Sequence, residues 1–145
     1  MLSKKSKYAI IALIHLAKRF GQGPIMIGKI AKQENIPKKF LEGILFELKN
    51  SGVVNSQRGK SGGYYLIKNP QDVHLAQIMR LFDGPIALIP CVTYQYYEPC
   101  PECNLEKTCA IRVVFKDLRD ATVEILKKAK LSEMIRIEEK LKGEL

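Results

Sequence analysis

A glycine-rich turn between two short strand-forming runs constrains this chain most, because it directly follows a segment with the pattern of a core helix. Residues 53–57 and 64–67 favour β-strands, and residues 58–63, with three glycines and two cations, join them. Glycines let a backbone approach a phosphate or a narrow groove, and Arg58 and Lys60 supply the charge that both attract. The turn opens no helix and has neither dinucleotide nor P-loop spacing, which argues against a nucleotide site. The sequence therefore predicts a β-hairpin suited to contact with nucleic acid.

The segments around this hairpin predict helices. Apolar periodicity indicates helices over residues 7–20, 27–35 and 37–51 and a fourth over residues 73–82. Asn35 can end the second helix in a left-handed conformation, and Pro37 opens the third. Two helices joined by a tight turn, the second basic at its start, are typical of a helix-turn-helix, although spacing alone also fits a plain helical hairpin. The hairpin that follows favours the helix-turn-helix. The buried face of its second helix is expected to comprise Phe40, Leu41, Ile44, Leu45 and Leu48.

The positive charge of the chain lies before the first cysteine. Residues 1–90 carry 14 Lys and Arg against 5 Asp and Glu, whereas residues 91–145 carry 10 of each. This asymmetry predicts a basic module that binds a polyanion, with nucleic acid as the first candidate and an anionic membrane surface as the second. No apolar run approaches the roughly 18 residues of a membrane span, and the N-terminus lacks a signal-peptide cleavage site, so we expect a cytoplasmic protein that does not enter a membrane.

All four cysteines lie in one stretch, at Cys91, Cys100, Cys103 and Cys109. In a reducing compartment such a cluster indicates metal ligands or redox groups rather than disulfides. The spacing matches neither the paired C-x2-C of a zinc ribbon nor the C-x2-C-x2-C of a bacterial ferredoxin. The residues alone therefore leave open an iron–sulfur cluster, a structural zinc ion and a metal-free thiol switch. An electron-transfer or redox protein is the alternative from another class, and it leaves the basic half unexplained.

The region after the cysteines predicts a long helix over residues 110–129 with two apolar lines along it. A chain of this size can cover only one of them, so the other is expected to meet a second copy in a homodimer. Ser132 is expected to cap a last helix over residues 133–141. The expected division is residues 1–85 for DNA binding, 86–109 for the cysteine loop and 110–145 for dimerisation.

The order of these elements resembles the Rrf family of bacterial winged-helix transcriptional regulators. The most specific match is the motif Arg58-Gly59-Lys60-Ser61-Gly62-Gly63-Tyr64, followed by a helix that closes on Asp83-Gly84-Pro85 and then by a cysteine loop. The resemblance implies a mainly α fold with a small β-hairpin wing, that is, a winged helix-turn-helix with a long C-terminal dimerisation helix. It also implies a homodimeric repressor, not an enzyme, that binds a pseudo-palindromic operator in double-stranded DNA.

The resemblance implies DNA contacts in three places. Residues 3–8 look like the family's opening, in which polar and basic residues touch phosphates, and positions 38–43 correspond to the recognition helix. Arg58 corresponds to the residue of the wing that enters the minor groove. The expected DNA-binding residues are Ser3, Lys5, Lys38, Lys39, Phe40, Glu42, Gly43, Arg58, Gly59, Lys60, Ser61 and Gly62.

The resemblance also bears on the cysteines. Family members place one cysteine after the fourth helix and two more, at x5 spacing, before the dimerisation helix, and Cys91, Cys103 and Cys109 match this pattern. Cys100 is an addition. Arg112 stands where some relatives use a histidine ligand, so either Cys100 completes the metal site or a residue near the partner's N-terminal helix does so. The resemblance implies a 2Fe-2S or 4Fe-4S cluster that controls operator binding and makes the protein a redox sensor, with zinc as the alternative.

Overall fold

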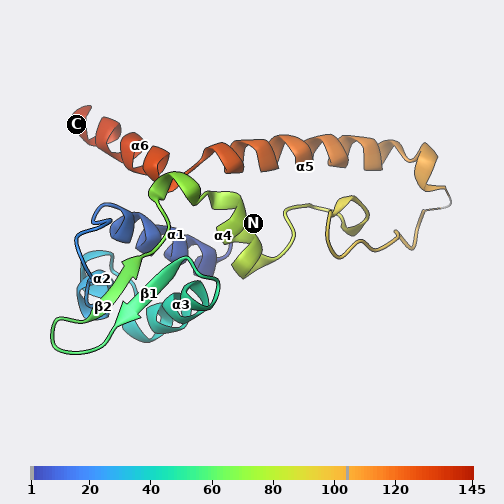
Figure 1. Cartoon of the computed structure of the whole chain (residues 1–145). Coiled ribbons are helices and arrows are strands. Elements are labelled where there is room, and N and C mark those ends of the chain that lie inside the picture. The colour runs from blue at the N-terminus through green and yellow to red at the C-terminus, as the bar shows by residue number, and fades with distance from the viewer. Residues whose placement is uncertain (1, 104) are drawn as a thin grey trace.

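The computed structural model describes residues 2–103 and 105–145. It shows a body built from the first four helices and a hairpin, from which one long helix extends as an arm (Figure 1). The cysteine loop runs out from the body and returns to the far end of this arm. The elements are α1 (Lys4–Ala17), α2 (Ile27–Gln33), α3 (Lys38–Asn50), β1 (Val54–Gln57), β2 (Gly63–Leu66), η1 (Pro70–Asp72), α4 (Leu75–Asp83), η2 (Pro90–Val92), η3 (Glu106–Thr108), α5 (Ala110–Lys128) and α6 (Leu131–Gly143).

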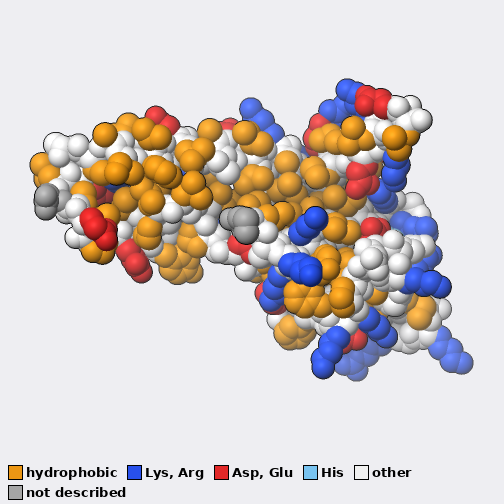
Figure 2. Space-filling view, turned by 180° about the vertical axis from the view of Figure 1, so that it is seen from behind, with side chains coloured by type: hydrophobic (Ala, Val, Ile, Leu, Met, Phe, Trp, Pro, Cys, Tyr) orange, Lys and Arg blue, Asp and Glu red, His pale blue; other side chains and the backbone are white. Residues whose placement is uncertain are grey.

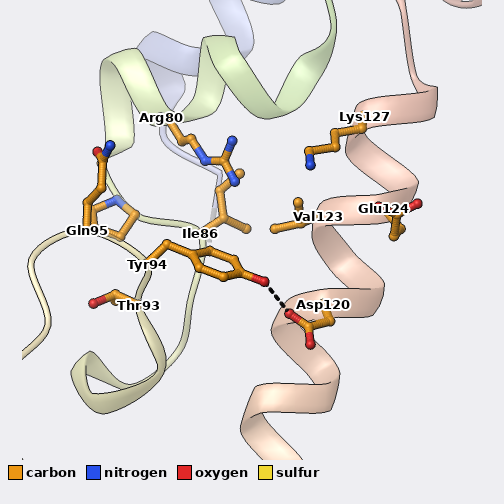
Figure 3. A pocket seen from close by; sticks show the side chains of 11 residues that line it. Arg80, Ile86, Thr93, Tyr94, Gln95, Asp120, Val123, Glu124 and Lys127 are labelled. Carbon is orange, nitrogen blue, oxygen red and sulfur yellow. Dashed lines mark hydrogen bonds between the residues drawn. The ribbon is translucent and has the colours of Figure 1, made fainter.

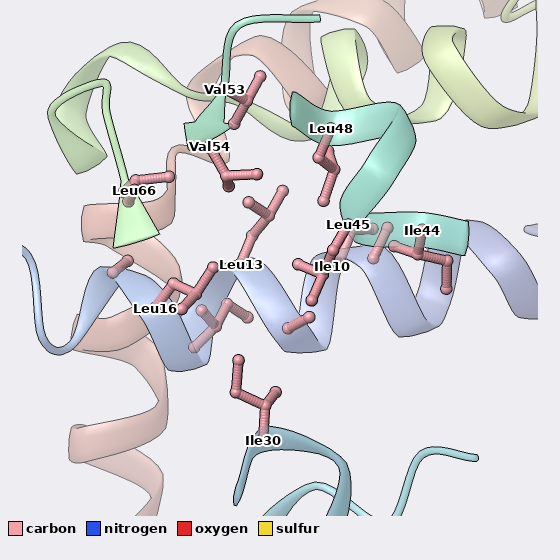
Figure 4. Close-up of a cluster of buried hydrophobic side chains, with 14 of the residues drawn as sticks. Ile10, Leu13, Leu16, Ile30, Ile44, Leu45, Leu48, Val53, Val54 and Leu66 are labelled. Atoms are coloured by element: carbon pink, nitrogen blue, oxygen red, sulfur yellow. The ribbon is translucent and has the colours of Figure 1, made fainter. Parts of the chain in front are cut away.

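The core of the body forms around α1. Its apolar side chains pack against α3 and the hairpin, as seen for Leu13, Leu45 and Val54 in Figure 4. Each of these side chains is fully buried, and burying one stabilises the fold by about 1.5–3 kcal/mol. The Ser3 hydroxyl begins α1 by accepting a hydrogen bond from the Ser6 amide at 3.0 Å. The core thus holds α3 and the hairpin in fixed positions on α1.

The turn from α2 to α3 follows the predicted pattern with two differences. Asn35 adopts the left-handed conformation, with φ of 53°, which ends α2 as expected. Pro37 precedes the first helical residue of α3 rather than occupying it, since its ψ of 124° is still extended. Phe40 was expected in the core and is 40% exposed. The inner face of α3 is already filled by residues spaced three, four and seven apart, namely Leu41, Ile44, Leu45 and Leu48.

The hairpin is anchored by a contact that the sequence pattern did not predict. β1 pairs antiparallel with β2, from Val54 opposite Leu66 to Gln57 opposite Gly63. Ile25, in the connection before α2, then pairs with Tyr64 through two backbone hydrogen bonds of 2.8 Å. Gly63 permits this pairing, because its φ is 151° and a Cβ there would lie 2.1 Å from the Ile25 carbonyl oxygen. The base of the wing is therefore fixed to the body.

The C-terminal helix returns to the body. Leu131 is fully buried, and its amide donates to the Val73 carbonyl at 2.9 Å. The prediction that Ser132 caps this helix is wrong: α6 begins at Leu131, because burial of that residue draws the helix start forward, and Ser132 lies within the first turn. No helix in residues 2–103 or 105–145 is long and apolar enough to cross a membrane.

Candidate functional site

The start of α3 and the tip of the wing present exposed cations on the side of the body away from α5 and α6 (Figure 1). Lys38 and Lys39 occupy the first turn of α3, and Arg58 and Lys60 flank the wing tip. In the part of the chain that the structure describes, none of the four forms an ion pair. The positive end of the α3 dipole adds to their field. This surface suits a polyphosphate backbone.

The outer face of α3 is open next to these lysines. Glu42 and Gly43 are exposed, and a Cβ added at Gly43 would have no atom within 4 Å. Phe40 is held at the edge of this face by Tyr8, whose ring meets it edge-on with centroids 5.6 Å apart. The first turns of α3 therefore combine two cations, a carboxylate, an aromatic ring and an open glycine on an accessible surface.

The wing places its predicted residues in two different environments. Arg58, Gly59, Lys60 and Ser61 are exposed, and Gly59 has a φ of 110°. Gly62 is buried, and a Cβ there would lie 2.2 Å from the Gln57 carbonyl oxygen. Gly62 therefore shapes the turn, whereas the four residues before it form the accessible tip.

Ser3 and Lys5 have partners within the protein. The Ser3 amide and hydroxyl both donate to the Asp83 carboxylate, and the Lys5 ammonium pairs with Glu47. Burial raises the pKa of Asp83, but the hydrogen bonds from Ser3 outweigh it and hold the pKa below its usual value. Lys5 also lies 5.5 Å from the centroid of the Phe82 ring. These contacts connect the start of α1 to α3 and α4, so the two residues hold these helices together.

The four cysteines, which span 19 residues of the chain, line one cavity of about 490 Å³. Cys91 is buried in η2, and Cys109 precedes α5, where its sulfur accepts a hydrogen bond from the Arg112 amide at 3.4 Å. Cys100 and Cys103 come from the loop between them. Within the described residues, no three His, Cys, Asp or Glu side chains already converge as a metal-binding set. The structure thus brings the predicted ligands to one cavity without placing them in coordination geometry.

Two thiols of the loop, Cys100 and Cys103, have pKa values above the ordinary value of cysteine. Cys100 donates a hydrogen bond to Glu102 at 3.0 Å, which raises the Cys100 pKa. Burial, followed by the neighbouring Cys109, raises the pKa of Cys103. Metal binding at the cavity would therefore release protons. Four cysteines that line one cavity fit a metal that prefers soft sulfur ligands, such as the iron of a cluster or zinc.

A buried arginine fastens the cysteine loop to the arm. Arg119 of α5 is 8% exposed and donates to the Val92 carbonyl, one residue after Cys91. It also donates to Asp120 at 2.8 and 2.9 Å and lies 4.0 Å from the centroid of the Tyr94 ring. The Tyr94 hydroxyl donates to Asp120 at 2.8 Å (Figure 3). The segment that carries Cys91 is thereby tied to the middle of α5.

The outer face of the arm is apolar and exposed. Apolar side chains run along it in Figure 2, while Lys and Arg side chains surround the body. Within the described chain, this face of α5 carries four large apolar side chains that are between 45% and 68% exposed, namely Ile111, Val114, Leu118 and Ile125. An apolar surface of this kind marks an interaction site.

Residues 2–137 match the sequence profile of the Rrf2 family, described as an iron-dependent transcriptional regulator. The chain belongs to the Rrf2 family. It is 45% identical over 121 residues to an Rrf2-like HTH-type transcriptional regulator of Rhodobacter capsulatus, covering 81% of each chain.

Two solved structures share the fold. CymR (YrzC), the global cysteine regulator of Bacillus subtilis, superposes with a TM-score of 0.79 at 30% identity, covering 94% of this chain and 97% of CymR. IscR of T. potens superposes with a TM-score of 0.76 at 25% identity, covering 97% of this chain and 90% of IscR. The predicted family and winged-helix fold are confirmed, and the protein is a DNA-binding transcriptional regulator rather than an enzyme.

Sequence reasoning did not single out two exposed cations of α2 or the two side chains that join the cysteine loop to α5. Lys29 and Lys32 are exposed on α2, the helix that crosses the DNA backbone in a helix-turn-helix. Their spacing opposite the apolar side of α2 was a signal that could have identified them. Arg119 and Tyr94 gave no such signal, since they lie 25 residues apart in sequence and meet only in the folded chain.

Proposed function

We propose that this Rrf2-family regulator binds a pseudo-palindromic operator as a homodimer, and that an iron–sulfur cluster held by the cysteine loop controls the binding. The observation that carries the proposal is that all four cysteines line one cavity at the start of α5. Along the chain, the segment that lines this cavity connects the basic body to the apolar arm. Residues 1–85 are the DNA-binding unit, 86–109 the cluster loop and 110–145 the dimerisation unit.

On DNA, the first turns of α3 enter the major groove and the wing lies beside them. Lys38, Lys39 and Glu42 face the base edges and flanking phosphates, and Arg58 and Lys60 reach the neighbouring backbone or minor groove. Gly43 lets the helix approach closely, since its surroundings are open. The exposed and unpaired state of these cations in the described structure supports this assignment.

The dimer forms through the outer face of α5. Covering its exposed apolar side chains removes them from water, which stabilises association by about 25 cal/mol for each Å². In a dimer with twofold symmetry, the two DNA-binding bodies are placed to contact the two half-sites of a palindromic operator.

Cys91, Cys100, Cys103 and Cys109 hold the cluster. When bound, an iron–sulfur cluster supplies iron–thiolate bonds and a redox-active centre. The chain itself provides the connection to the arm: Cys91 is one residue from Val92, which Arg119 holds, and Cys109 caps α5. A change in the position of either cysteine therefore acts directly on α5, and through α5 on the relative placement of the two DNA-binding bodies.

A thiol switch without metal is the second candidate. Cys103 and Cys109 are neighbours in the structure, since Cys109 contributes to the raised pKa of Cys103. A two-electron oxidant such as a peroxide would convert the two thiols to a disulfide, with loss of two protons and two electrons, and so join the loop to the start of α5 without a cluster. The experiment on the cluster separates the two candidates.

The cluster is tested by purifying the protein without oxygen and measuring iron, acid-labile sulfide and zinc per chain. Matched iron and sulfide, lost in Cys91→Ser and Cys109→Ser but kept in Thr93→Ser, are expected. Operator affinity should then differ by about 5- to 150-fold between the cluster-bound and cluster-free protein. A colourless protein with one zinc per chain, or equal affinity in both forms, would refute cluster control and leave DNA binding standing.

DNA binding is tested on an operator selected from random DNA by the wild-type protein. Arg58→Ala and Lys39→Ala are each expected to weaken binding and to flatten the slope of log affinity against log salt by about 0.9 for each lost phosphate contact. Lys142→Ala, on α6, is the control and should change neither. Unchanged affinity in both α3 and wing variants would contradict the proposed interface.

A further inference from the structure

A second cavity, separate from the one lined by cysteines, lies between α4 and α5. Its volume is about 450 Å³. Arg80, from the last turn of α4, and Lys127, from the last turn of α5, extend into it from opposite sides (Figure 3). Ile86, Val123 and the Tyr94 ring form its other walls.

The two cations of this cavity lack a direct anionic partner in the described part of the chain. Within the described residues, neither Arg80 nor Lys127 forms an ion pair or a side-chain hydrogen bond. Burial, then the charges of Arg80, Lys127 and Lys130, lowers the pKa of nearby His74. Two like charges held across a small space are unfavourable unless an anion lies between them.

The two carboxylates that line the cavity do not supply this anion. Oδ1 of Asp120 is the acceptor for both Tyr94 and Arg119 at the far end of the space. The Glu124 side chain is turned away from Arg80 in Figure 3. The cavity thus has a cationic end with no protein partner and an apolar body formed by one aromatic and two branched side chains.

We propose that this cavity binds a small organic carboxylate, with the carboxylate group between Arg80 and Lys127 and the apolar part against Tyr94 and Val123. Guanidinium and ammonium donors on a carboxylate form the stronger class of hydrogen bonds. A simple inorganic anion would leave the apolar walls uncovered. The bound molecule bridges α4 of the DNA-binding body to α5 of the arm, so the site has the position of an effector site.

Dimerisation through the arm leaves this site accessible. At 100° for each residue, Val123 and Lys127 lie on nearly the opposite side of α5 from Val114, Leu118 and Ile125. A second copy on the outer face therefore does not cover the cavity. The inference goes beyond the proposed function, because binding of the carboxylate requires neither DNA nor a cluster.

The test is calorimetric titration of the full-length protein, purified without oxygen, with sodium benzoate. We expect saturable binding that weakens by about tenfold or more in Arg80→Gln and in Lys127→Gln, since each removes one charged hydrogen bond. Lys128→Gln, the adjacent exposed residue on α5, is the matched control and should bind as the wild type does. Circular dichroism of each variant verifies the fold, and Arg80→Lys, which keeps the charge, should retain part of the affinity.

Three results would overturn the inference. The first is the absence of saturable benzoate binding to the wild-type protein. The second is equal affinity in the two glutamine variants and the control, which would place benzoate elsewhere. The third is binding of benzamide or inorganic phosphate as tightly as benzoate. Benzamide lacks the negative charge, and phosphate lacks the apolar ring.

Discussion

Replacing Gly43 by alanine should change stability and DNA binding in opposite directions. Gly43 lies within α3, and an added Cβ would meet no atom within 4 Å. Alanine is favoured over glycine inside a helix by about 0.8–1.0 kcal/mol, chiefly because alanine loses less conformational entropy than glycine when the chain folds. The free energy of unfolding should therefore rise by about 1 kcal/mol. For a chain of 145 residues this corresponds to roughly 3 °C in Tm.

The same methyl group should weaken operator binding. If the first turns of α3 lie in the major groove, the added Cβ collides with the DNA, and overpacking of this kind costs about 1–3 kcal/mol, or about 5- to 160-fold in affinity. Thermal unfolding followed by circular dichroism and a fluorescence-anisotropy titration measure the two effects. Gly143→Ala, at the end of α6, is the control and should leave affinity unchanged. A less stable variant would refute the helix argument, and unchanged affinity would refute the placement of α3 on DNA.

Other substitutions test the long-range contacts. Gly63→Ala should lower the free energy of unfolding in urea by roughly 2–4 kcal/mol, because the backbone strains and two hydrogen bonds to Ile25 break; a loss under about 1 kcal/mol would contradict this. Arg119→Ala should cost about 2 kcal/mol and speed amide exchange in residues 91–95, whereas unchanged exchange would show that Arg119 does not hold the loop. Because the pKa of Asp83 is lowered, its contribution is present above pH ~4 and is lost as pH falls through the folded pKa; the stability difference between wild type and Asp83→Asn should therefore shrink in acid, and a constant difference would contradict the pairing with Ser3.

Elements that depend on neighbouring residues were predicted well. The hairpin, the left-handed turn at Asn35 and the span of α5 all agree with the structure within a few residues. Local periodicity and turn chemistry determine such features. The errors arose where packing decides: Phe40 is exposed because other side chains fill the inner face of α3, and α6 begins early because Leu131 is buried.

The site residues divide in the same way. The cations of α3 and the wing are exposed as their sequence pattern indicated, and the cysteines line one cavity as their clustering indicated. Ser3 and Lys5, by contrast, have partners 80 and 42 residues away that no spacing rule identifies. Their internal contacts had to be seen in the folded chain.

The sequence by itself determined the family, the order of the helices and hairpin, the basic first half and the grouping of the cysteines, because each is a local pattern along the chain. Only the tertiary structure decided how the cysteine loop meets the arm through Arg119, that Gly62 is buried in the wing, and that Arg80 and Lys127 share a cavity. These features join segments far apart in the chain. Their geometry follows from how the core packs, which residue spacing does not encode.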